Sequence, residues 1–74
     1  MGTPHGTGSF VAHTGTDVYG PGKVIGVEGV RRRVRFTRYV ATIRADDLRA
    51  ASAAEKREVE AWLRARKARY GGAW

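Results

Sequence analysis

The chain has 74 residues and no cysteine, and its 14 Lys and Arg outweigh 7 Asp and Glu, which gives a formal net charge of +7. This length suffices for one domain with a small apolar core, and the absence of cysteine excludes disulfides and thiolate–metal sites as supports for that core. Such a charge favours association with polyanions or acidic protein surfaces. Eleven of the cations are arginine, whose planar guanidinium can donate two parallel hydrogen bonds to one phosphate. Enrichment in arginine and alanine also arises in GC-rich genomes.

The first eight residues are small, polar and rich in glycine, so we expect residues 1–8 to form a disordered lead-in to a single domain over residues 9–74. This segment has neither the basic start nor the apolar stretch of a secretory signal. No stretch is long and apolar enough to span a bilayer. The sequence therefore favours a cytoplasmic protein without a membrane partner.

Short segments rich in β-branched and aromatic residues follow, separated by turn-forming residues. We expect strands over residues 9–13, 18–19 (a fragment), 23–28, 30–37 and 39–44. Gly26 indicates a bulge, and Gly29 fits a tight hairpin with positive φ. Residues 45–49 break the strand pattern and fit a single helical turn. Three or four short strands at this spacing are typical of a small barrel or meander.

Residues 30–37, Val-Arg-Arg-Arg-Val-Arg-Phe-Thr, are the most informative segment. Successive side chains of a strand point to opposite faces. One face therefore carries Arg31, Arg33 and Arg35. The other carries Val30, Val34 and Phe36, with Arg32 as its one charged residue. Because the apolar face must pack on a core, the arginine row is expected to face water, either as a phosphate-binding surface or as a charged face that protects against aggregation.

Residues 18–44 hold seven cations and one anion, a segment charge of +6, so the positive charge is concentrated there. Predicted nucleic-acid contacts are Arg31, Arg33 and Arg35 at the centre, Lys23, Arg38 and Arg44 at the flanks, and Tyr39 as an exposed aromatic for base stacking. A tyrosine with a buried ring and a hydrated hydroxyl is the alternative for Tyr39.

The carboxy-terminal part has the clearest helix signals. Ser52 and Glu55 form a capping box, the acids precede the cations, and Gly71 follows a predicted helix over residues 53–70, leaving a tail over residues 71–74. Its apolar stripe consists of Val59, Trp62, Leu63 and Tyr70. We expect this stripe to dock on the sheet with Trp62 as the main anchor. Alternatively, the helix projects outward and a protein partner binds Trp62, Tyr70 and Trp74.

Residues 17–29, Asp-Val-Tyr-Gly-Pro-Gly-Lys-Val-Ile-Gly-Val-Glu-Gly, resemble the start of SH3-like barrels. Similar modules are the KOW and Tudor-like domains of ribosomal and transcription factors, the polymerase-binding domain of the CarD family and the Tudor-like domain of some bacterial helicases. Residues 45–50 look like the short turn that often precedes the last strand of such barrels. The resemblance covers residues 9–51 and implies a mainly β fold with α: an SH3-like small barrel of antiparallel strands followed by the amphipathic helix. Members bind DNA, RNA, polymerase or peptides, so the fold leaves the function open.

No pattern in the chain indicates catalysis or a cofactor. His5 and His13 lack cysteine partners for a metal, and Asp46 and Asp47 lack a partner for acid–base chemistry. We therefore expect a protein that is not an enzyme: a small basic protein that binds DNA or RNA through the phosphate backbone with little sequence specificity. The alternative is an adaptor that acts on RNA polymerase, the ribosome or another acidic host factor.

Overall fold

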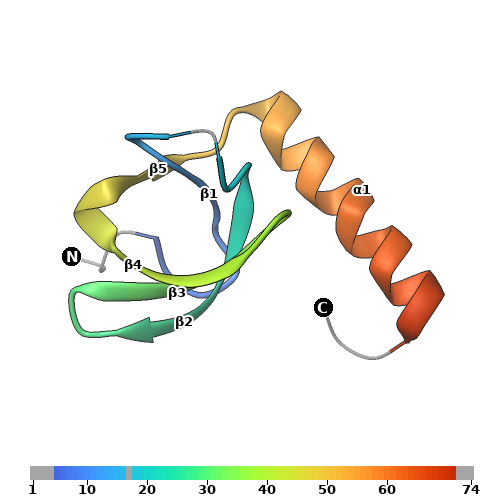
Figure 1. Cartoon of the computed structure of the whole chain (residues 1–74), viewed down its shortest axis with the longest axis horizontal. Helices are drawn as coiled ribbons and strands as arrows, with labels where there is room; N and C mark the ends of the chain where they lie inside the picture. Colours follow the sequence, from blue (N-terminus) through green and yellow to red (C-terminus); the bar gives the residue numbers. More distant parts are fainter. Residues whose placement is uncertain (1–4, 17, 72–74) are drawn as a thin grey trace.

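The computed structural model describes residues 5–16 and 18–71, which form one antiparallel sheet and one helix (Figure 1). Its elements are β1 (Phe10–His13), β2 (Gly22–Glu28), β3 (Arg31–Phe36), β4 (Val40–Arg44), the 3-10 turn η1 (Ala45–Asp47), β5 (Leu48–Ala50) and α1 (Ala53–Tyr70). The strand order in the sheet is β4-β3-β2-β1-β5. The expected mainly β fold with a carboxy-terminal helix is confirmed, as is the helical turn after β4.

The β2–β3 hairpin fixes which side chains of β3 face outward. Its register shifts between Val24 and Gly26, which confirms the predicted bulge. Gly29 forms the turn with a φ of 58°, in the region that favours glycine. At the start of β2, a Cβ on Gly22 would lie 2.7 Å from the Arg35 carbonyl oxygen, so only glycine allows this close approach of the two backbones.

Three features of the strands and turns differ from the sequence-based expectations. Val18 and Tyr19 lie in a turn instead of a strand fragment. Val30, expected on the apolar face, occupies the hairpin turn and is 66% exposed, because the tight turn takes it out of the alternation. The strand β5 was not predicted: it has three residues and pairs with β1 through a long-range contact that local patterns do not encode.

Residues 5–8, expected as part of a disordered lead-in, are hydrogen-bonded to the sheet. The Gly8 amide donates to the Val24 carbonyl at 2.8 Å, and Nε2 of His5 lies 3.2 Å from the Leu48 carbonyl oxygen. The two carbonyl groups that accept these bonds belong to buried residues, so the segment satisfies backbone acceptors at the core of the sheet. Residues 1–4 of the expected lead-in lie outside the described residues.

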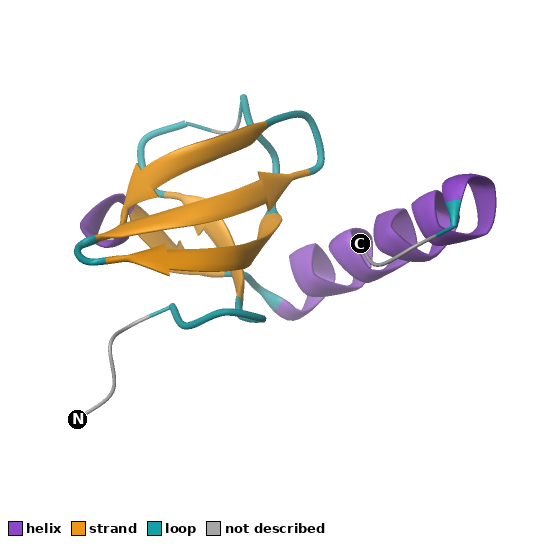
Figure 2. Ribbon diagram, turned by 90° about the horizontal axis from the view of Figure 1, so that it is seen from below, coloured by secondary structure: helices purple, strands orange, loops and turns teal. Residues whose placement is uncertain are grey.

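The sheet is curved (Figure 2), and its core is a small cluster of buried side chains. Its buried members come from four strands: Val11, Val24, Val34, Phe36 and Leu48. Tyr19, Ala41 and Ile43 pack against this cluster from partly buried positions. The predicted inward positions of Val34 and Phe36 are therefore confirmed.

Arg32 shares the inward face of β3 and is fully buried. Its guanidinium donates to three backbone carbonyl oxygens: those of Gly29 at 2.7 Å, Arg31 at 2.8 Å and His5 at 3.1 Å. Hydrogen bonds from a charged donor contribute about 1.5–3 kcal/mol each. Arg32 therefore ties the hairpin turn and the amino-terminal segment to the core, which explains why an arginine is compatible with this otherwise apolar face.

Helix α1 begins and ends as predicted, but the residue that anchors it on the sheet is not the predicted one. Val59 is its fully buried residue, whereas Trp62 and Leu63 are half-buried and Tyr70 is 58% exposed. The prediction of Trp62 as the main anchor is therefore wrong. The helix contacts β1 and β2, and its distal half extends away from the sheet (Figure 1).

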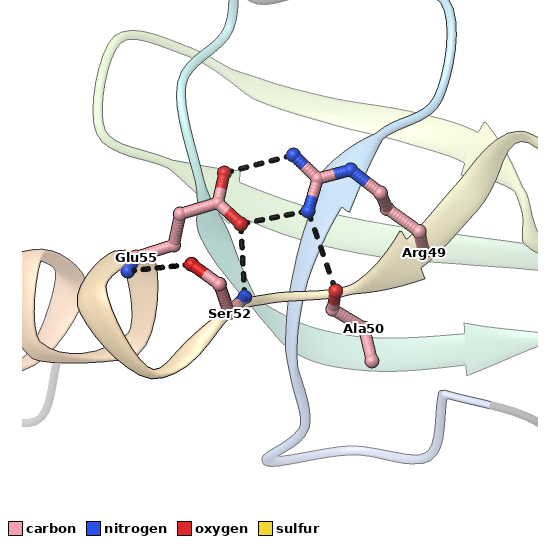
Figure 3. Close-up of polar contacts among 4 residues, drawn as sticks. All are labelled: Arg49, Ala50, Ser52 and Glu55. Carbon is pink, nitrogen blue, oxygen red and sulfur yellow. Dashed lines mark hydrogen bonds and ion pairs between the residues drawn. The ribbon is translucent and has the colours of Figure 1, made fainter.

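The amino-terminal end of α1 is fixed by the predicted capping box (Figure 3). The Glu55 amide donates to the Ser52 hydroxyl oxygen at 3.2 Å, and the Ser52 amide donates to the Glu55 carboxylate at 2.9 Å. Arg49 of β5 donates to both carboxylate oxygens, at 2.7 and 2.9 Å. This bidentate pair holds the first turn of α1 against the last strand. The Arg49 hydrogen bonds, followed by the Ser52 amide, lower the pKa of Glu55 from 4.5 to about 2.

Glu55 should therefore contribute stability that depends on pH. Its folded-state pKa is depressed, so the contribution is fully present above pH 4.5 and is lost as the pH falls through about 2. We expect Glu55→Gln to lower the free energy of unfolding by about 1 kcal/mol at pH 6, with a difference from the wild type that shrinks between pH 4.5 and 2. Urea unfolding of the wild type and the variant across this pH range measures the difference in the free energy of unfolding. Glu58→Gln, on an exposed position of the same helix, is the charge-matched control, and an equal pH profile for both variants would contradict this role of Glu55.

Candidate nucleic-acid interface

The register of β3 separates its arginines onto two faces, as the alternation predicted. Arg31 and Arg33 are exposed and Arg35 is half-buried, while Arg32, Val34 and Phe36 are buried. The three outward arginines are spaced two residues apart on a strand that is paired on both sides. Their backbone positions are therefore fixed by the sheet, so a polyanion meets them in a preformed row.

Pairing with β2 and β4 brings further cations to this outer face. In antiparallel pairs, directly opposite residues lie on the same face with their Cβ atoms about 5 Å apart. Arg44 of β4 is opposite Arg31, and Lys23 of β2 is opposite Arg35. We define the basic face as these five residues: Lys23, Arg31, Arg33, Arg35 and Arg44. Glu28 is also opposite Arg31 and is the acid that the register brings to this face.

The ion pairs within the described residues leave the basic face strongly positive. Arg44 lies 3.8 Å from Asp46, but both side chains are largely exposed, so water and salt screen this pair. The second pair joins Arg49 to Glu55 at the helix start, away from β3. Neither pair includes Arg31 or Arg33, whose guanidinium groups are accessible to an external anion.

The β3–β4 turn places Arg38 and Tyr39 next to the basic face. Arg38 is exposed, and its Nη1 donates to the Val18 carbonyl at 3.4 Å, a long bond that leaves the guanidinium at the surface. Tyr39 is 54% exposed, in agreement with its selection as an exposed aromatic. The rings of Tyr39 and Tyr19 make an edge-to-face contact with their centroids 5.6 Å apart, and Tyr19 stacks on buried Phe36 with a centroid distance of 5.1 Å. These ring contacts connect Tyr39 to the core and restrict the motion of its side chain.

A cleft of about 200 Å³ lies between this turn and α1. The turn and the adjoining ends of β3 and β4 contribute residues 35–40, and the helix contributes Trp62 and Arg66. The Arg66 guanidinium lies over the rings of Trp62, at 5.2 Å, and Tyr70, at 5.4 Å. Arg66 lies outside the contacts predicted on the sheet. The spacing of Trp62, Arg66 and Tyr70, four residues apart along one helix face, is the sequence signal that points to it.

The alternative partner-binding residues fall in two different environments. Trp62 faces the cleft from a half-buried position, and Tyr70 is exposed near the end of α1. Trp74 lies outside the described residues. Across residues 5–16 and 18–71, no group of three or more His, Asp or Glu side chains is placed to ligate a metal, and no helix has the length and apolar character to cross a membrane.

Comparison with protein-family models, with curated proteins and with solved structures finds no match to this chain. Function is therefore inferred from its own residues, their geometry and their charge.

Proposed function

We propose that this chain is an SH3-like small barrel with a carboxy-terminal helix, and that it binds DNA or RNA through the phosphate backbone with little sequence specificity. The curved antiparallel sheet and the short η1 turn before the last strand support the barrel assignment. The basic face supports nucleic acid as the partner.

The observation that carries this proposal is the row of Arg31 and Arg33, both exposed, within a face that the strand register enriches in cations. Arginine binds phosphate through two parallel N–H donors, and such charge-assisted bonds are about twice as strong as neutral ones. Because the strands space the side chains regularly, they match a regularly spaced polyanion better than a single anion.

The same geometry explains the low sequence specificity that we propose. Sequence is read by side chains that reach base edges in a groove, usually from a helix or a protruding ribbon. The basic face is the broad side of a sheet, where the guanidinium groups meet phosphates first. Contacts of this kind fix position and supply affinity without distinguishing bases.

Salt dependence tests the electrostatic part of the proposal. With about four phosphates neutralised, counterion release lowers the affinity for duplex roughly 100-fold between 50 and 200 mM salt. Fluorescence anisotropy with labelled 20-mers of two unrelated sequences measures this, and both sequences should give the same dissociation constant. An affinity that does not change with salt, or a strong preference for one sequence, would contradict backbone binding.

A second candidate is a protein-binding adaptor, which the exposed Tyr70 and the projecting half of α1 favour. The charge of this half favours nucleic acid, since residues 62–70 hold four cations and no acid. An adaptor retains a specific protein after nuclease digestion of the bound material, whereas a backbone binder loses its ligand.

A further inference from the structure

The cleft between the β3–β4 turn and α1 is continuous with the basic face, because Arg35 belongs to both. Arg35 extends the row of Arg31 and Arg33, and Val40, directly opposite it on β4, also lines the cleft. A chain of phosphates that follows the outward arginines of β3 therefore reaches the mouth of the cleft. We propose that this cleft takes an unpaired base, so that the protein binds single-stranded nucleic acid in preference to duplex; this inference rests on the proposed function.

The size of the cleft suits one planar ring. Its volume of about 200 Å³ is below the roughly 300–1,000 Å³ of typical small-ligand pockets. Tyr39 borders it from the turn and Trp62 from the helix, so two aromatic side chains meet the same space. Bases stack on such rings irrespective of their identity, because every base has a π face. The stacking site therefore keeps the low sequence preference of the basic face.

Tyr39 is suited to act as a stacking platform because it is both exposed and supported. The edge-to-face contact with Tyr19 and the stack of Tyr19 on Phe36 connect it to the core. An exposed ring that is already held loses little conformational freedom when a base stacks on it. The exposed area of Tyr39 is therefore available for binding at a small entropic cost.

Three arginines surround the cleft and complement the charge of a strand that enters it. Arg35 comes from the end of β3, Arg38 comes from the turn, and Arg66 comes from the helix. A guanidinium that lies over an aromatic ring, as Arg66 does over Trp62, still directs its N–H edge sideways, where it can bind phosphate. Phosphates on either side of an inserted base would meet these groups. An acidic peptide satisfies the arginines but offers no row of planar rings for Tyr39 and Trp62, so nucleic acid fits the cleft better.

A duplex cannot use this site without disruption, because its bases are paired and stacked inside the helix. It would be restricted to the phosphate contacts of the basic face. A single strand gains the base contact in addition, so the two forms should differ in affinity under identical salt conditions.

The test compares single-stranded and duplex 20-mers of the same sequence at 100 mM salt, for the wild type and for Tyr39→Ala. We expect the wild type to bind the single strand about tenfold more tightly than the duplex, and Tyr39→Ala to remove roughly that factor for the single strand alone. Tyr39→Phe should retain single-strand binding. Val30→Ala, which shortens an exposed apolar side chain of the β2–β3 hairpin turn outside the cleft, is the control and should change neither affinity by more than about twofold.

An abasic oligonucleotide separates the base contact from the phosphate contacts. It should bind the wild type as weakly as the intact strand binds Tyr39→Ala, and it should show no further loss with that variant. Equal affinities for the single strand, the abasic strand and the duplex would overturn the inference while leaving backbone binding in place. Absence of binding to all three at 50 mM salt would overturn the proposed function as well.

Discussion

Arg32→Ala should lower the free energy of unfolding by about 3 kcal/mol or more, the largest effect that we expect from any single change in the β3 strand. The substitution leaves the carbonyl oxygens of Gly29, Arg31 and His5 without the buried guanidinium that now donates to them. Hydrogen bonds from a charged donor contribute about 1.5–3 kcal/mol each, and removal of the fully buried side chain also leaves a cavity. Small domains have about 5–15 kcal/mol of stability in total. Urea unfolding followed by far-UV circular dichroism measures the loss.

Arg33→Ala is the matched control, because Arg33 is the next residue in the same strand and is exposed. Its unfolding free energy should stay within about 0.5 kcal/mol of the wild type. Arg32→Lys should restore only part of the stability, since an ammonium lacks the planar fork that reaches several carbonyls at once. A loss below about 1 kcal/mol for Arg32→Ala would show that Arg32 does not support the hairpin.

The contrast between Arg32 and its neighbours shows how far the sequence predicts this site. Alternation along a strand is a local rule, so it places Arg31, Arg33 and Arg35 outward and Arg32 inward. It does not reveal the acceptors of Arg32, because the His5 carbonyl lies 27 residues away and comes from a segment with no regular pattern. The residues of the basic face could therefore be predicted from the sequence, whereas the hydrogen bonds that allow Arg32 to be buried could not.

The short strand β5 was missed for a related reason. Leu48 is its one buried residue, so three residues carry no alternation that could be recognised. The strand forms because β1 offers an unpaired edge, with His13 opposite Leu48 and Val11 opposite Ala50. Such long-range pairing depends on the folded sheet and not on local propensity.

The helix was predicted in extent but not in placement. Capping by Ser52 and Glu55 and termination at Gly71 are local signals, and both are confirmed. The docking point depends on geometry: α1 starts next to β5, and a helix advances about 1.5 Å per residue. Tyr70 therefore lies about 16 Å beyond Val59 along the axis, outside the reach of this small sheet. The same geometry brings Trp62 and Arg66 to the β3–β4 turn and so forms the cleft.

Replacing the exposed arginines of β3 together, as Arg31→Ala/Arg33→Ala, should weaken binding to both single strands and duplex about 100-fold at 100 mM salt. Two charge-assisted hydrogen bonds to phosphate, at about 1.5 kcal/mol each, correspond to this factor. The slope of log affinity against log salt should also fall by about 2, because two phosphate contacts are lost. Neither side chain belongs to the core, so the fold should persist.

The most direct measurement of the central claim compares this variant with Lys56→Ala/Arg57→Ala, which removes the same charge from exposed positions near the start of α1. Binding of a mixed-sequence 20-mer is measured by anisotropy for the wild type and both variants between 50 and 200 mM salt. If the outward arginines of β3 bind phosphate, the β3 variant loses about 100-fold and the α1 variant loses less than about fivefold. Equal losses in both variants would mean that net charge alone attracts the nucleic acid and that the basic face is not a site.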